Sequence, residues 1–130
     1  MSMLKTVYEI AEKVRKEVEG NYGDFLNGKC IEASDRISLL LKEKNIPHKI
    51  VEGWCVYDDF ISCTDRPYDE HTWIELIDED KTYIDVTATQ FASFIDEEIP
   101  EIIVGKRPYY MQHNEPDEEQ LEEIGGNYKF

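Results

Sequence analysis

Two alternating segments, residues 71–77 and 82–88, constrain the fold more than any other part of the sequence. Apolar and polar residues alternate in both with a period of two, which is typical of β-strands with one buried face. The short acidic turn between them predicts an antiparallel pair. If residues 78–80 form the loop, Ile77 faces Lys81 across the strand pair. We predict this register because it keeps the apolar side chains on one buried face, whereas a slip of one residue would mix the two faces. The mostly apolar face then carries Thr72, Ile74, Leu76, Thr82, Ile84, Val86 and Ala88.

The same register brings a histidine and an aspartate together on the opposite face. Asp85 lies opposite Trp73 and is a diagonal neighbour of His71, at about 7–8 Å between backbones. A carboxylate at that separation can orient an imidazole through a hydrogen bond. We therefore predict a pairing of these two side chains on a face that carries His71, Trp73, Glu75, Tyr83, Asp85 and Thr87.

A cysteine opens the helix that the sequence predicts before these strands. Cys30 follows a glycine-containing loop, residues 20–28, and Asn45 and Pro47 end the helical pattern. A helix N-terminus favours negative charge and can lower the pKa of a thiol. Cys30 is therefore a candidate nucleophile, with His71 as its base and Asp85 as the group that orients the base. The buried face of this helix is predicted to carry Ala33, Ile37, Leu40 and Leu41.

Other segments have simpler patterns. A first helix is expected over residues 3–19, capped by Ser2 and ended by Gly20, with Lys, Arg and Glu opposite an apolar stripe. A strand is expected over 48–57, where Gly53 indicates a bulge or a close backbone approach, followed by an acidic loop over 58–70. The stripe of the first helix comprises Leu4, Val7, Tyr8, Ala11, Val14 and Val18.

The last third of the chain gives weaker signals. Residues 99–104 are compatible with a strand and 105–108 with a turn, and an acidic tail with a short helix at 117–124 is expected to be mobile over 114–130. One domain, residues 1–130 with a core over about 3–111, fits this length. Core positions expected here are Phe91, Phe94, Ile95, Tyr109, Tyr110 and Met111.

The net charge of −15 is unevenly distributed. Residues 1–57 hold nine basic and nine acidic residues, whereas residues 58–130 hold five basic and twenty acidic ones. Such a field repels phosphate backbones and anionic lipids, so we expect no nucleic-acid or membrane partner, and it favours a basic partner or substrate. The sequence shows no signal peptide, no membrane span and three irregularly spaced cysteines, which predicts a cytoplasmic protein without a disulfide framework.

Three blocks in residues 28–91 resemble the transglutaminase-like family of the papain-like cysteine peptidase superfamily. They match its Gly-x-Cys, its helix ending in a Gly-Ile-Pro-like turn, its Val-x-Gly strand, its His-Ala-Trp-Val-Glu block and its aromatic-x-Asp-x-Thr block. In this chain the blocks are Gly28-Lys29-Cys30 with Asn45-Ile46-Pro47 and Val51-Glu52-Gly53, then His71-Thr72-Trp73-Ile74-Glu75-Leu76, then Tyr83-Ile84-Asp85-Val86-Thr87-Ala88-Thr89.

The resemblance implies a papain-like α+β fold, with N-terminal helices packed on an antiparallel sheet and the cysteine at the start of one helix. It also implies that Cys30, His71 and Asp85 cleave or transfer amide bonds of peptides or glutamine side chains through an acyl-enzyme, without a cofactor. Two positions depart from the family: Ile31 stands where animal transglutaminases have tryptophan, and Val86 where proline is common. Neither change removes a catalytic group.

Several alternatives stay open at this stage. The same fold could serve as a catalytically inactive acidic module that binds or inhibits a protein. Trp54 and Trp73 could bind substrate or could only be walls of the core. A zinc site of Cys30, Cys55, Cys63 and His71 is disfavoured because it contains no Cys-x-x-Cys pair, and the acidic loop lacks the spacing of a calcium-binding EF-hand. We therefore expect no metal.

Two further questions are left unanswered by the sequence. The Cys30 N–H is one donor for an oxyanion, and its second donor could be Asn27, the backbone near Asp24 or a tyrosine. The oligomeric state is unknown.

Overall fold

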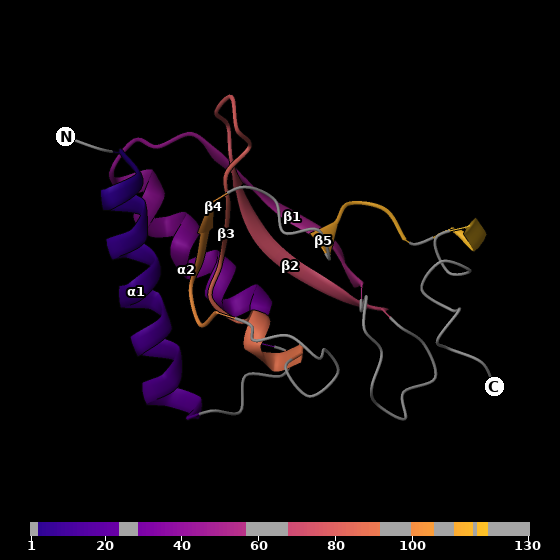
Figure 1. The fold of residues 1–130 in the computed structure, drawn as a ribbon. Helices are drawn as coiled ribbons and strands as arrows, with labels where there is room; N and C mark the ends of the chain where they lie inside the picture. Colours follow the sequence, from indigo (N-terminus) through magenta and orange to yellow (C-terminus); the bar gives the residue numbers. More distant parts are fainter. Residues whose placement is uncertain are drawn as a thin grey trace.

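The described residues of the chain form two long helices and one antiparallel sheet (Figure 1). The computed structural model describes residues 3–23, 29–56, 68–91, 100–105, 111–115 and 117–119. The five strands follow the order β4-β3-β2-β1-β5, so the α+β class is confirmed. The elements are α1 (Met3–Tyr22), α2 (Cys30–Glu43), β1 (His48–Val56), β2 (Tyr68–Leu76), β3 (Tyr83–Asp85), the 3-10 helix η1 (Ala88–Phe91), β4 (Ile103–Gly105) and β5 (Met111–Gln112).

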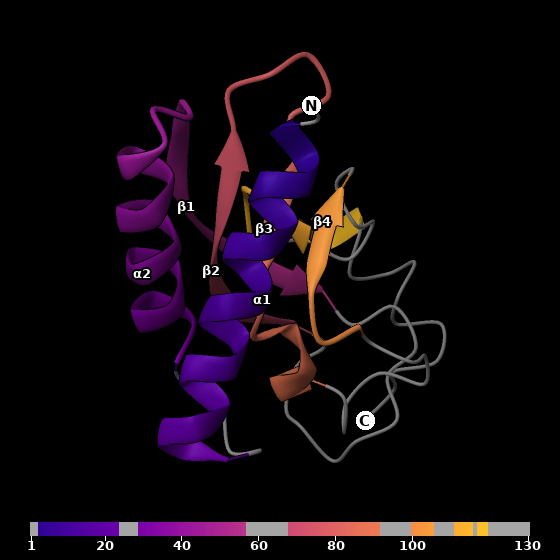
Figure 2. The ribbon, with the colours of Figure 1, turned by 90° about the vertical axis from the view of Figure 1, so that its left-hand side faces the viewer.

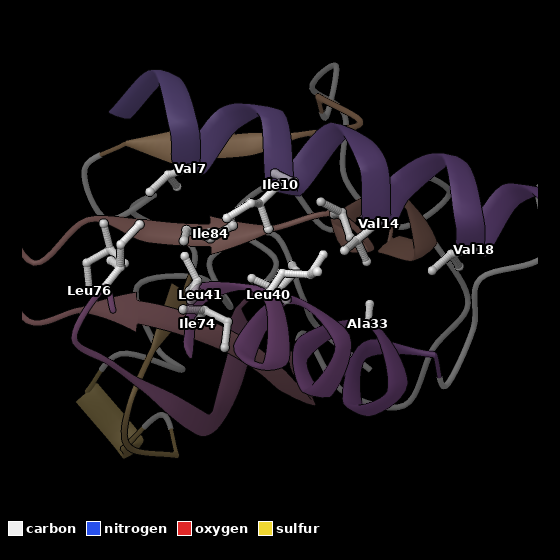
Figure 3. Packing of buried hydrophobic residues seen from close by; sticks show 14 residues of the cluster. Val7, Ile10, Val14, Val18, Ala33, Leu40, Leu41, Ile74, Leu76 and Ile84 are labelled. Carbon is white, nitrogen blue, oxygen red and sulfur yellow. The ribbon is translucent and has the colours of Figure 1, made fainter. Parts of the chain in front are cut away.

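Both helices cover the same side of the sheet. Helix α2 packs against β1 and β2, and α1 packs against α2 and β4 (Figure 2). Between these layers lies the larger of two apolar clusters (Figure 3). Among the described residues, neither helix is long and apolar enough to cross a membrane. The larger cluster contains Val7, Ile10, Ala11, Val14, Val18, Ala33, Ile37, Leu40, Leu41, Ile46, Ile74, Leu76, Ile84 and Val86.

The predicted register of the central strand pair is confirmed. Ile74 pairs with Ile84 and Glu75 with Tyr83, which sets Trp73 opposite Asp85. The helix side of the pair is apolar, and Trp73 and Tyr83 lie in a second cluster on the other face. This second cluster contains Val51, Cys55, Trp73, Tyr83, Ala88, Ile103 and Met111.

The second strand of the pair is shorter than predicted. It ends at Asp85 because the Thr87 N–H donates to Asp85 Oδ1 at 2.9 Å, a side-chain turn that bends the chain out of the sheet. The prediction of a strand continuing to Ala88 is therefore wrong. Ala88 opens η1 and packs in the second cluster rather than on the helix side.

Helix α2 matches its prediction closely. It starts at Cys30, its four predicted core positions are buried, and Asn45 adopts a left-handed φ of 57° just beyond its end. The Ile46 N–H donates to the Leu41 carbonyl at 3.0 Å, which satisfies one of the last carbonyls of the helix.

Helix α1 begins at Met3 as predicted but ends later than predicted, and its expected cap, Ser2, lies outside the described residues. It continues through Gly20 to Tyr22 and ends where Gly23 adopts a φ of 64°. Leu4 and Tyr8 are about half exposed, because the buried face is centred on Val7, Ala11, Val14 and Val18 and these two side chains lie on its flank. Two residues outside the predicted stripe, Ile10 and Arg15, are buried instead.

Gly53 marks a close backbone approach and not a bulge. Strand β1 pairs with β2 without interruption from His48↔Leu76 to Val56↔Tyr68. A Cβ at Gly53 would collide with the Trp73 indole and would lie 2.6 Å from the Gln112 carbonyl oxygen. Only glycine lets the indole and β5 approach this strand so closely.

The remaining boundaries were predicted less well. Strand β2 begins at Tyr68, inside the segment expected to be loop, and β4 spans Ile103–Gly105 rather than 99–104. Strand β5 was not predicted, although Met111 is buried as expected. Other expectations fall outside what the structure describes: core roles for the side chain of Phe91 and for Phe94, Ile95, Tyr109 and Tyr110, most of the tail over 114–130 and most of the helix over 117–124.

Candidate active site

His71 and Asp85 form a buried pair across the central strands. The Nε2–H of His71, on β2, donates to Asp85 Oδ2 at 2.6 Å, and both side chains are almost fully enclosed. The other carboxylate oxygen, Oδ1, accepts from the backbone N–H of Thr87 at 2.9 Å and from its hydroxyl at 3.3 Å. Both oxygens of Asp85 are therefore engaged, which fixes the orientation of the carboxylate and, through it, of the imidazole.

Cys30 reaches this pair from the first turn of α2. The helix lies over β2, where the Ser34 hydroxyl donates to the Thr72 carbonyl at 3.4 Å. Lys29 occupies the N-cap position without a side-chain cap hydrogen bond, so it does not occupy the N–H groups of the first turn. The thiol of Cys30 interacts with His71 and with Thr72. Since Nε2 of His71 faces Asp85, Nδ1 is the ring nitrogen that remains for the cysteine.

The electrostatics of the three groups favour separated charges. Burial works to raise the pKa of the Cys30 thiol, but the hydrogen bond and charge of His71, helped by Thr72, outweigh it and lower that pKa. Burial works to lower the pKa of His71, but the adjacent Asp85 carboxylate and Cys30 raise it to about 9. Both shifts favour a thiolate beside an imidazolium near neutral pH.

A cleft of about 380 Å³ opens at Cys30 and His71. The paired strands set two carboxylates at it, because Glu52 faces Thr72 and Glu70 faces Trp54 across the ladder, and both glutamates are exposed. Trp54 and the half-exposed Ile31 give the cleft its apolar surface. The complete lining is Cys30, Ile31, Glu52, Gly53, Trp54, Glu70, His71 and Thr72.

The two tryptophans that the sequence offered as substrate-binding residues lie in different places. Trp54 lines the cleft and is partly exposed, whereas Trp73 is fully buried and is not part of the lining. The Trp73 indole packs between two histidines, with ring centroids 5.9 Å from His71 and 6.2 Å from His113. It therefore forms a wall behind the base.

A second histidine–carboxylate pair lies beyond that wall. His113 Nε2 is 3.2 Å from Glu75 Oε1 and 3.0 Å from the Tyr83 hydroxyl, and Lys49 Nζ is 3.1 Å from the other oxygen of Glu75. Burial works to raise the pKa of Glu75, but Lys49 and His113 lower it overall. The sequence placed Glu75 and Tyr83 on this face but gave no reason to pair them with His113.

Sequence reasoning also missed two residues that support Asp85. Thr87 holds the second carboxylate oxygen, and an Asp-x-Thr sequence at the end of a strand is a signal for such a turn. Arg15 donates to the Val86 carbonyl at 2.9 Å from within the buried face of α1. The sequence gives no comparable signal for Arg15, which falls among the charged residues of the first helix.

Other expectations of the site are only partly visible. In the described part of the chain, no group of three or more His, Cys, Asp or Glu side chains is arranged to hold a metal ion. Cys30 and Cys55 are both buried and lie in separate places, Cys30 at the cleft and Cys55 in the second apolar cluster, and Cys63 lies outside the described residues. Asn27 and Asp24, considered as sources of a second oxyanion donor, also lie outside them, and no tyrosine is among the described residues that line the cleft, so the Cys30 N–H is the candidate donor found there.

Comparison of this chain with protein-family models, with curated proteins and with solved structures found no match. Functional interpretation therefore depends on the geometry of the site.

Proposed function

We propose that this protein is a thiol-dependent hydrolase or acyl transferase that acts on amide bonds of peptides or glutamine side chains through a Cys30–His71–Asp85 triad. The observation that carries the proposal is the buried 2.6 Å bond between His71 and Asp85, with Cys30 at the same cleft as His71. A buried cysteine that only fills space in the core does not require a neighbouring histidine of raised pKa whose orientation is fixed by a carboxylate, whereas a nucleophilic cysteine does.

The reaction follows from the positions of the three groups. The Cys30 thiolate attacks the carbonyl carbon of the amide, and the oxygen that becomes negative accepts a hydrogen bond from the Cys30 N–H at the start of α2. The His71 imidazolium then gives its proton to the amide nitrogen as the carbon–nitrogen bond breaks and the amine leaves. The neutral His71 takes a proton from water or from an acceptor amine, which attacks the thioester and restores the Cys30 thiolate. Asp85 holds the ring orientation through both proton transfers.

The proposal includes the fold relationship. Two N-terminal helices lie on an antiparallel sheet, one of them with the cysteine in its first turn, and the histidine and aspartate occupy neighbouring strands. This arrangement is compatible with a papain-like, transglutaminase-like core, and it presents the three residues in the chain order that such a core requires.

The charges at the cleft favour a basic substrate. Glu52 and Glu70 both line the cleft, and among the described residues neither has an ion-pair partner. The nearby Lys29 lies over the Tyr22 ring at 4.3 Å instead of at the glutamates. A positively charged group beside the scissile amide would offset this negative charge, so we expect Glu52→Lys to weaken cleavage or transfer of lysine- or arginine-containing peptides more than of neutral ones.

The first experiment measures the reactivity of each cysteine with iodoacetamide at about pH 6, resolved by peptide mass spectrometry. Free thiols are largely protonated there, whereas a thiolate paired with an imidazolium still reacts. Cys30 is expected to be labelled rapidly in the wild type and about as slowly as an ordinary protonated thiol in His71→Ala, whereas Cys55, which is fully buried, is expected to be labelled slowly in both. His113→Ala is the matched control, since it removes a histidine of the other pair and should leave labelling of Cys30 unchanged.

The opposite result has a clear meaning. If Cys30 is labelled as slowly as Cys55 in the wild type, or at the same rate with and without His71, the triad does not function as a nucleophilic pair. The binding-module interpretation of the acidic chain would then replace the enzyme.

A further inference from the structure

Helix α1 contributes a buried cation behind the aspartate of the site. The Arg15 side chain is about 6% exposed, and its Nη1 donates to the Val86 carbonyl and to the Thr89 hydroxyl, both at 2.9 Å. The same nitrogen is 3.5 Å from the Glu101 carbonyl oxygen, and Nε is 3.3 Å from Glu19 Oε1. One guanidinium thus joins α1 to the end of β3, to η1 and to the segment that leads into β4.

A role in packing alone does not explain this residue. A buried charge loses its hydration, and well-packed apolar residues of similar volume often serve a core equally well or better. What an apolar side chain cannot do is donate hydrogen bonds to acceptors on three separate segments. Arg15 makes contacts with residues 71, 74 and 86 positions further along the chain.

These contacts lead directly to the catalytic carboxylate. Val86 follows Asp85, and the next residue, Thr87, holds Asp85 Oδ1 through its N–H and its hydroxyl. Arg15 fixes the carbonyl of Val86 on one side of Thr87 and the hydroxyl of Thr89 on the other. The backbone that orients Asp85 is therefore held at both ends by a single side chain of another element. Figure 2 shows α1 running in front of β3, with η1 and β4 beside it.

We propose that Arg15 is a positioning residue of the active site, which acts through residues 86–89 to keep Asp85 aligned with His71 and thereby keeps Cys30 reactive. The inference rests on the proposed function and adds to it a residue that touches neither substrate nor reacting atoms. Displacing the Val86–Thr89 segment would lengthen the bond between Asp85 and His71, and His71 would then stabilise the thiolate less.

The test is the pH profile of iodoacetamide labelling of Cys30 in Arg15→Ala and Arg15→Lys, with thermal unfolding measured in parallel. Arg15→Ala is expected to raise the pH midpoint of labelling by about one unit, which slows labelling at pH 6 about tenfold. Arg15→Lys is expected to lie between this variant and the wild type, because an ammonium keeps the charge but cannot reach the same set of acceptors. The other charged groups at the site, Asp85, Glu52 and Glu70, are retained in both variants.

Arg36→Ala is the matched control. It also removes a guanidinium–glutamate interaction with α1, the exposed contact of Arg36 with Glu17 at 3.0 Å, but has no contact with residues 86–89. It is expected to lower the unfolding temperature slightly and to leave the labelling midpoint unchanged. A purely structural Arg15 would behave in the same way, losing stability without a shift of the midpoint.

Thr89→Val covers the case in which Arg15→Ala does not fold. This nearly isosteric change removes only the hydroxyl that Arg15 holds, and a raised midpoint supports the proposal. If Arg15→Ala folds and keeps the wild-type labelling midpoint, the proposed role of Arg15 is overturned. If Arg15→Ala does not fold, the same result for a folded Thr89→Val overturns it. That result is distinct from failure of the proposed function, in which the wild type itself shows the midpoint of an ordinary cysteine and His71→Ala changes nothing.

Discussion

Two histidine–carboxylate pairs share one face of the sheet, separated by the Trp73 indole, and they differ in the exposure of the histidine, since Glu75 is nearly as buried as Asp85. His71 and Asp85 are enclosed and 2.6 Å apart, whereas the His113 side chain is 43% exposed and lies 3.2 Å from Glu75. Burial without a partner would make His71 neutral, but burial with a carboxylate raises its pKa to about 9. At His113 water is available to replace the partner. Enclosure, and not the pairing of residue types, distinguishes the candidate catalytic base.

The largest expected effect is the difference in the free energy of unfolding between removing Asp85 and removing Glu75. Asp85→Ala leaves His71 buried without a counter-charge and is expected to cost about 3 kcal/mol or more of the free energy of unfolding. Glu75→Gln is expected to cost less than about 1 kcal/mol, because Lys49 and His113 are both exposed enough to be hydrated. Urea denaturation of the two variants measures the difference, and equal costs would contradict the comparison.

The pH dependence of stability gives the next effect. The pKa of His71 is raised from 6.5 to about 9, so its protonated form stabilises the fold fully below pH 6.5, and this contribution is lost as the pH rises through 9. The contribution of Cys30 to stability depends on pH in the opposite direction. Its pKa is lowered in the fold, so this contribution is present above the pKa of an unfolded cysteine and is lost as the pH falls. In the wild type the two effects oppose each other between pH 6.5 and pH 9, because folding favours a proton on His71 and disfavours one on Cys30.

Cys30→Ala removes one side of this balance. The pKa of His71 in this variant is still raised by Asp85 but no longer by Cys30, so the free energy of unfolding is expected to fall above pH 6.5, by up to about 1.4 kcal/mol per pH unit, over a window that ends below pH 9, while the wild-type value changes less. Adding His71→Gln should remove the slope, and adding His113→Gln should keep it. Parallel pH profiles for Cys30→Ala and the wild type would show that the thiol and the imidazole are not coupled.

The smallest effect concerns the wall between the two pairs. Gly53→Ala would push a methyl group into the Trp73 indole and the Gln112 carbonyl, at an expected cost of about 1–3 kcal/mol. Gly20→Ala is the matched control, since its Cβ position has no described atom within 4 Å apart from its chain neighbours and the backbone of its own helix, and alanine favours the helix by up to about 1 kcal/mol. Thermal unfolding should therefore shift in opposite directions, and a neutral Gly53→Ala would show that the indole can move aside.

The predictability of the site from sequence follows from how local each signal is. The two-residue period of the strands fixed which residues share a face, and with it the pairing of His71 and Asp85. Cys30 was found because a helix start has its own pattern of glycine, polar and apolar residues. The end of β3 at Asp85 was missed because a side-chain turn by Thr87 overrode the alternating pattern.

The features that the sequence missed depend on contacts between distant segments. The burial of Arg15 depends on carbonyls more than 70 residues away in the chain, so the sequence of α1 alone does not predict it. In the same way, the position of His113 beside Glu75 depends on β5, a strand of two residues with no periodicity to detect. The exposed flank that carries Leu4 and Tyr8 has the same origin, because the adjacent layers decide which side of a helix is covered.

The contacts of Arg15 also have a consequence for the order of folding. Closing a loop of 71 to 86 residues costs more chain entropy than forming the local β1–β2 and β2–β3 pairs, so the contacts of α1 with the Val86–Glu101 region are expected to form late. During synthesis, α1 leaves the ribosome long before its last acceptor, the Glu101 carbonyl. Cys30, His71 and Asp85 are all made before that point, so, with the proposed role of Arg15, we expect the thiol to reach its full reactivity only after the chain has been extended well past the triad itself.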